Sequence, residues 1–303
     1  MKPYWQLFAM NVLFLCICFS PVSVSASQWI ENRVPYNYYN GHIFNSGPRC
    51  APTATINTFI YLKSRFPDLY DSESKIIPDW NANGQTSDEY ITSRSKISDT
   101  GWTNDEGIDR QGMYVPAIGT YAQSWWETIN YWIEDFVAGT TYVYGQINPP
   151  DLDPEDNPDI NQWYNGNLIQ QKYPTFDSLW NSLALGAGVI VGIYPQGSRY
   201  GHAISLTGLS FEDLDDDLTW DPDELARIYY VDPNKTGQEL SANLWIDTQN
   251  GGRMEFNWWQ NPSPEVYLAI DYILVPVPEP QSAILLVCAI TGMLVSVKKN
   301  LFL

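Results

Sequence analysis

Cys50 is the first residue of this chain whose type and surroundings suggest chemistry. It follows the turn-forming run 45–49, and Pro52, which the first turn of a helix tolerates, comes shortly after it. Apolar residues then recur at helical spacing up to about Arg65, so we expect a buried helix that begins at Cys50 or one residue later. The helix dipole and the free N–H groups at such a position favour the thiolate, which is the nucleophilic form of cysteine.

Cys50 is also expected to be the one cysteine of the mature protein. Cys16 and Cys18 lie in an apolar run within residues 1–26, which have the features of a secretory signal peptide, and Cys288 lies in a second apolar run near the C-terminus. A lone cysteine in an exported protein has no disulfide partner and indicates a reactive thiol. The alternative is a small, buried apolar side chain.

A cysteine nucleophile needs a histidine for proton transfer and an acceptor that orients this histidine. The chain has two histidines, His42 and His202. His202 begins one predicted strand and Asp232 ends the next, so antiparallel pairing is expected to bring these two side chains to the same edge of a sheet. The order Cys50, His202, Asp232 and the wide spacing after the cysteine are typical of papain-like enzymes.

The segments that must position these residues are predicted to be mostly helices in the earlier part of the chain and mostly strands in the later part. Helices are predicted at about 52–65, 113–137 and 174–183, and strands at 142–147, 189–194, 200–208, 226–231, 244–246, 253–258 and 267–275. We expect residues 34–40 to be extended and the polar segment 70–112 to be irregular. This order predicts the α+β class, with the nucleophile helix packed on an antiparallel sheet that carries the histidine and the aspartate.

Composition limits the partners. With 44% hydrophobic residues the chain has enough apolar side chains for a large core, which we assign to one domain at 27–275. The formal net charge of −19 argues against nucleic acid and anionic membrane surfaces as partners.

Three sequence blocks resemble a known family. Cys-Ala-Pro-Thr-Ala at 50–54, Gly-His-Ala-Ile-Ser-Leu-Thr-Gly at 201–208 and Tyr-Tyr-Val-Asp-Pro-Asn at 229–234 resemble the blocks of C39-like cysteine peptidases. They are also similar to those of the immunoglobulin-degrading streptococcal peptidases. The resemblance implies a papain-like fold and peptide-bond hydrolysis, with Cys50 as nucleophile, His202 as base and Asp232 as the residue that orients the base.

The same resemblance implies an oxyanion hole beside the backbone N–H of Cys50. Many relatives have Cys-Gly at the nucleophile and a glutamine upstream of it, whereas this chain has Ala51 after the cysteine. Asn45 or Asn40 is therefore predicted to supply the side-chain donor.

The C-terminus, 276–303, resembles a PEP-CTERM sorting signal. Val-Pro-Glu-Pro-Gln-Ser at 277–282 precedes the apolar run 283–297, which is short for a membrane span, and then Lys298-Lys299. This resemblance implies a Gram-negative bacterium, processing by signal peptidase and exosortase, and transient membrane anchoring. The expected location is the cell surface, the outer membrane or the extracellular matrix.

The segment between the predicted His and Asp strands is strongly acidic. Asp213, Asp215, Asp217, Thr219, Asp221 and Glu224 match positions 1, 3, 5, 7, 9 and 12 of a calcium-loop template. Position 6 is Leu218 where an EF-hand has glycine, and strands are expected to flank the segment, so it is not predicted to be an EF-hand. It is either a solvated acidic loop or a calcium loop that orders the hairpin and so fixes the register of His202 and Asp232.

Together these patterns predict a secreted cysteine peptidase that acts on a protein or peptide, requires no cofactor and has a possible calcium site. One alternative is a transglutaminase or acyltransferase with the same triad. Another is a catalytically inactive surface-binding or matrix-binding protein.

Overall fold

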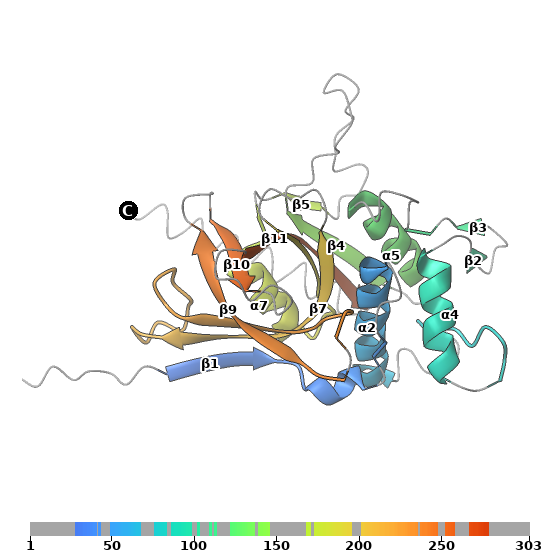
Figure 1. Ribbon diagram of the computed structural model, residues 1–303, viewed down its shortest axis with the longest axis horizontal. Coiled ribbons are helices and arrows are strands. Elements are labelled where there is room, and N and C mark those ends of the chain that lie inside the picture. The colour runs from blue at the N-terminus through green and yellow to red at the C-terminus, as the bar shows by residue number, and fades with distance from the viewer. Residues whose placement is uncertain are drawn as a thin grey trace, which may run out of the picture.

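The computed structural model describes residues 28–40, 42–43, 49–67, 76–83, 86–98, 102–103, 109–110, 112–113, 122–136, 139–145, 168–170, 173–195, 201–235, 237–247, 252–257 and 267–278. The predicted signal peptide lies outside these residues, as does almost all of the predicted sorting signal. The predicted α+β class is confirmed: helices α2, α4 and α5 gather on one side of the molecule, and an antiparallel sheet occupies the other (Figure 1).

Six strands pair in a closed ring. They are β6 (Ile190–Pro195), β7 (His202–Asp213), β8 (Ala226–Val231), β9 (Leu240–Asp247), β10 (Arg253–Asn257) and β11 (Tyr267–Pro278). Each pairs with the next, and β6 closes the ring because it pairs with both β7 and β11. All six pairings are antiparallel, so the chain enters and leaves each strand at alternating ends of the ring.

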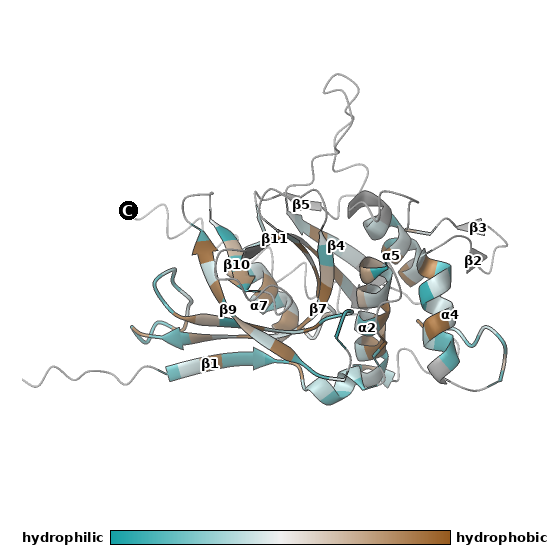
Figure 2. Cartoon of the chain, viewed as in Figure 1, coloured by the Kyte–Doolittle hydropathy of each residue, from teal (hydrophilic) through white to brown (hydrophobic). Residues whose placement is uncertain are grey.

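Three strands extend the ring. β1 (Gln28–Arg33) pairs with β7, and β4 (Gly139–Gly145) pairs with β11. β5 (Leu168–Gln170) pairs with β4 in the parallel direction. β1 is exposed or half-buried along its whole length and shows hydrophilic colours in Figure 2, as expected for an edge strand that covers one side of β7. Two short strands, β2 (Trp102–Thr103) and β3 (Asp109–Arg110), pair separately.

Helix α2 (Cys50–Arg65) is the most deeply buried helix of the described part of the chain. Every residue from Ala51 to Leu62 is buried, including the threonines and Asn57. The buried polar side chains bond either within the helix or to neighbouring elements. The Thr55 hydroxyl donates to the Ala51 carbonyl at 2.8 Å and accepts from Trp125 of α5 (Ala122–Phe136) at 2.8 Å. Helix α7 (Phe176–Ala184) is capped by Thr175, as the sequence indicates.

Two predictions about local structure are wrong. Residues 34–40 are not all extended, because Tyr36–Tyr39 form a short 3-10 helix, η1, in which Tyr39 stacks on Tyr61 of α2. The segment 70–112 is not irregular throughout, because Thr86–Ser98 form helix α4. This helix packs against α2 through few apolar residues. It shows mixed colours in Figure 2, so its hydrophobic periodicity is weak.

The signal peptide and the sorting signal predicted at the two ends of the chain remain predictions. β11 reaches Pro278, so strand pairing with β4 continues three residues past the predicted domain end at 275. Among the described residues no helix combines the length and the hydropathy that a membrane crossing requires.

Candidate active site

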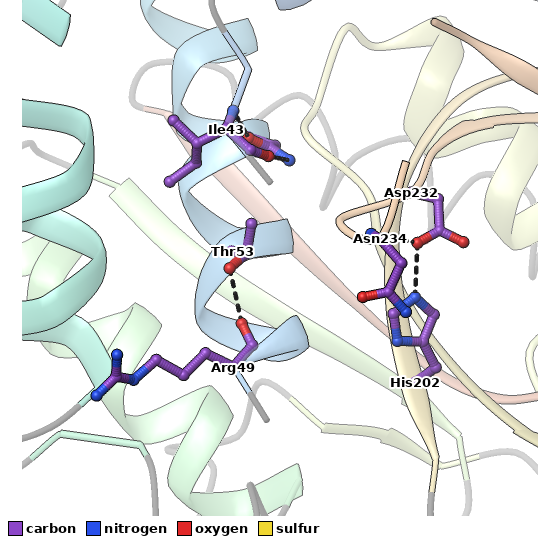
Figure 3. Close-up of polar contacts among 7 residues, drawn as sticks. Ile43, Arg49, Thr53, His202, Asp232 and Asn234 are labelled. Carbon is purple, nitrogen blue, oxygen red and sulfur yellow. Dashed lines mark hydrogen bonds and ion pairs between the residues drawn. The ribbon is translucent and has the colours of Figure 1, made fainter. Parts of the chain in front are cut away.

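The structure confirms the predicted position of Cys50 at a helix start. Cys50 is the first residue of α2, and its side chain is partly exposed. Arg49 precedes the helix, and its carbonyl accepts from the Thr53 N–H at 3.0 Å and the Thr53 hydroxyl at 2.8 Å (Figure 3). Since Pro52 has no N–H, the free donors of this first turn are concentrated around the cysteine.

His202 and Asp232 meet at the edge where β7 begins and β8 has ended. His202 Nε2 lies 2.8 Å from Asp232 Oδ1, and the aspartate is completely buried (Figure 3). The same oxygen accepts the backbone N–H of Asn234 at 2.7 Å, in the turn that the Asp-Pro-Asn sequence forms. With Nε2 held by Asp232, the ring nitrogen Nδ1 is left to face Cys50.

Cys50 and His202 come together because α2 packs along β7. The buried Ser205 hydroxyl donates to the Ala54 carbonyl at 2.8 Å and accepts from the Thr58 hydroxyl at 3.1 Å. Ala54 is one helical turn from Cys50, and Ser205 is three residues from His202. This pair of bonds therefore sets the two reacting side chains at the same end of their elements.

Gly201 allows β7 to begin close to β6. A Cβ atom at this position would lie 2.6 Å from the Tyr194 ring and 2.9 Å from the Ile193 carbonyl oxygen. His202 itself pairs with Ile193, so a side chain at Gly201 would push the histidine end of β7 away from its neighbour.

Electrostatics favour an ion pair between the cysteine and the histidine. Burial opposes the Cys50 thiolate, but the hydrogen bond and charge of His202, together with the N–H groups of Ala203 and Ala51, outweigh burial and lower the pKa of the thiol. Burial likewise opposes the His202 imidazolium, yet the hydrogen bonds to Asp232 and Cys50 raise its pKa to about 9. Both shifts act in the direction of a thiolate beside an imidazolium.

The other histidine is bound elsewhere. His42 Nδ1 lies 3.1 Å from the Tyr39 carbonyl oxygen, and its Nε2 accepts the Gly237 N–H at 3.1 Å. This arrangement needs the neutral ring, and burial lowers the pKa of His42 in agreement with it.

The described residues do not test the predicted oxyanion donors. Asn45 lies outside the described residues, and Asn40 is exposed at the end of η1, where its N–H donates to the Asn37 carbonyl at 3.2 Å. The assignment of either residue stays a prediction.

The structure adds positioning residues that the sequence analysis missed. Besides Ser205, the Asn57 amide bonds to both the N–H and the carbonyl of Ile43, at 2.8 and 3.0 Å, and so anchors the chain before the nucleophile to α2. Small polar residues inside an otherwise apolar helix or strand are the signal that marks such contacts in a sequence.

The predicted calcium ligands lie together, far from the triad. Two groups, Asp213, Asp215 and Glu224, and Asp215, Asp217 and Asp221, each have carboxylate oxygens within 4.8 Å of one another. They occupy the connection between β7 and β8, at the opposite end of these strands from α2 (Figure 1).

Comparison with models of known protein families and with curated protein sequences found no match to this chain, so the proposals below depend on its own residues and geometry.

Proposed function

We propose that the protein is a papain-like cysteine peptidase that cleaves peptide bonds with Cys50, His202 and Asp232. One observation carries the proposal: a partly exposed thiol at a helix N-terminus bonds to a histidine whose other ring nitrogen is held by a buried carboxylate. A nucleophile, a proton carrier and an orienting acceptor in this order are the components of acyl transfer.

In the proposed reaction the Cys50 thiolate attacks the carbonyl carbon of the substrate, and the carbonyl electrons move to oxygen. When the C–N bond breaks, the leaving amine takes the proton from His202 Nδ1, and a thioester remains on the sulfur. Water then attacks the thioester and gives a proton to the same nitrogen, which releases the acid and restores the thiolate. Asp232 keeps Nδ1 directed at the sulfur and stabilises the imidazolium.

The proposal is tested first on the thiol. Iodoacetamide should alkylate Cys50 at pH 6 to 7, where an ordinary thiol with a pKa of about 8.5 is almost entirely protonated. Mass spectrometry after timed quenching gives the rate, and the His202→Ala variant is the comparison. An alkylation rate that rises only above pH 8 would show an ordinary cysteine.

The second test is hydrolysis of a library of quenched fluorescent peptides. Wild-type protein should cleave at least one sequence, and Cys50→Ala should abolish that cleavage while its thermal unfolding stays cooperative. Turnover by Cys50→Ala would contradict the proposal. Products joined to an added primary amine, with no free acid, would instead indicate a transferase.

A further inference from the structure

The connection between β7 and β8 has a buried carboxylate without a counter-charge. Asp213, the last residue of β7, is 2% exposed, and its Oδ1 has no hydrogen-bond partner in the described part of the chain. The other oxygen, Oδ2, accepts the Leu218 N–H at 3.2 Å. A buried charged oxygen left unpaired is strongly unfavourable, so this atom points to a missing ligand.

A second buried acid faces the same place. Glu224 accepts the N–H groups of Leu214 at 2.7 Å and Asp221 at 3.0 Å, one on each oxygen. Its carboxylate lies within 4.8 Å of those of Asp213 and Asp215. Within the described residues neither Asp213 nor Glu224 forms an ion pair with a lysine or arginine. The group thus collects negative charge that nothing in the described chain neutralises.

The backbone conformation answers the main argument against a calcium loop, which is the absence of glycine at position 6 of the template. Leu218, at the template position that normally requires glycine, adopts φ 63, and Asp216 two residues earlier adopts φ 62. Leu218 is 71% exposed, so packing of its side chain does not explain this conformation. The loop makes its sharp turn even though leucine disfavours a positive φ. The turns are held by side-chain acceptors: Asp215 accepts the Asp217 N–H at 3.3 Å, and Asp217 accepts the Thr219 N–H at 2.7 Å.

We propose that this loop binds a calcium ion through the carboxylates of Asp213, Asp215 and Glu224, and that Asp217 and Asp221, which form a second group with Asp215, complete its coordination. Calcium fits this donor set better than magnesium because it takes six to eight oxygen ligands in flexible geometry. Magnesium instead demands near-octahedral geometry and usually keeps several waters. The ion gives the unpaired Asp213 oxygen its partner.

The expectation that calcium fixes the register of His202 and Asp232 directly is wrong, because the site lies at the far end of the hairpin. It joins the end of β7 to the start of β8, whereas His202 and Asp232 lie at the other end of the same strands, about 35 Å away for eleven extended residues. Calcium therefore stabilises the β7–β8 pair against unfolding and is independent of whether the proposed peptidase activity is found.

The test is thermal unfolding and titration calorimetry of the purified protein with calcium chloride, with magnesium chloride and with EDTA. Calcium should raise the melting temperature in a concentration-dependent way, because it binds the folded form. Asp215→Asn removes an exposed carboxylate shared by both groups but keeps an acceptor for Asp217, and should weaken calcium binding at least about tenfold. Asp223→Asn removes an exposed charge from the same loop at a position outside the template, and should change affinity less than about twofold.

Three results would overturn the proposal. The first is an unchanged melting temperature and no binding heat at millimolar calcium. The second is equal weakening by Asp215→Asn and Asp223→Asn, which would indicate diffuse charge screening. The third is binding of magnesium as tight as that of calcium, which would exclude the calcium assignment.

Discussion

The two ends of the β7–β8 pair each bury a carboxylate, but they neutralise it differently. Asp232 is fully buried and bonds to His202 and to the Asn234 N–H. At the other end, Asp213 has a buried oxygen with no hydrogen-bond partner in the described part of the chain, beside a second buried acid, Glu224. One end therefore pairs its carboxylate with a histidine that can carry a positive charge, and at the other end we propose that a calcium ion supplies the positive charge.

The largest effect is expected at the end of the β7–β8 pair that holds His202 and Asp232. His202→Ala should slow alkylation of Cys50 at pH 6 by about a hundredfold or more, since the thiol loses the partner that lowers its pKa. Peptide hydrolysis should fall on the order of 10⁴-fold. The control is His42→Ala, which removes a histidine engaged by Gly237 and should leave both rates unchanged. An equal loss in the two variants would refute the assignment of the base.

The next prediction concerns Asp232, which is proposed both to orient His202 and to stabilise its charged form. Asp232→Asn should reduce hydrolysis by about 10²- to 10⁴-fold, and should lower the pKa of His202, because the bond to Asp232 is the main interaction that raises it. The proposed reaction needs the imidazolium to protonate the leaving amine. Wild-type activity should thus decline as the pH rises through about 9, and the decline in Asp232→Asn should begin at lower pH. A pH–rate profile measures both limits, and an unshifted alkaline limb would contradict this role.

In the third prediction, removing the buried carboxylate should change the free energy of unfolding in opposite directions at the two ends of the β7–β8 pair. In EDTA, Asp232→Asn should lower the free energy of unfolding by about 2–4 kcal/mol, since it breaks a buried charge pair. Asp213→Asn should raise it by about 1 kcal/mol, because it removes one of two facing carboxylates and keeps an acceptor for Leu218. Urea unfolding measures both differences. Destabilisation of similar size by the two variants would mean that the ends are not different in this respect.

The smallest effect concerns the turn itself. Leu218→Asn should stabilise the protein by about 1 kcal/mol or less, because asparagine tolerates the left-handed conformation that leucine adopts there. Leu225→Asn is the matched control: it changes another exposed leucine in the same connection that does not have a positive φ, and should not stabilise. Differential scanning calorimetry resolves changes of this size.

The site was easier to predict than parts of the fold. Turn residues before Cys50, Pro52 after it and apolar residues at helical spacing are local signals, and the helix begins where they place it. The pairing of His202 with Asp232 followed from strand order alone, since antiparallel neighbours place these ends together.

Most of what was not predicted depends on contacts distant in sequence. Helix α4 was missed because its sequence is mostly polar and its burial comes from packing on α2. Closure of the ring requires β6 to pair with both β7 and β11, a choice that no local pattern specifies. The turn at Leu218 was unexpected because leucine disfavours positive φ, and the surrounding loop imposes it.

The hydrogen bonds that join Ser205 to α2 also determine when Cys50 can become reactive during folding. They include a bond between Ser205 and Ala54, 151 positions apart in the chain, so Cys50 does not meet His202 until β7 has formed and docked on α2. In a nascent or unfolded chain we expect Cys50 to be an ordinary thiol, which is mostly protonated at neutral pH. We therefore expect thiol reactivity at low pH to measure completed folding in this protein.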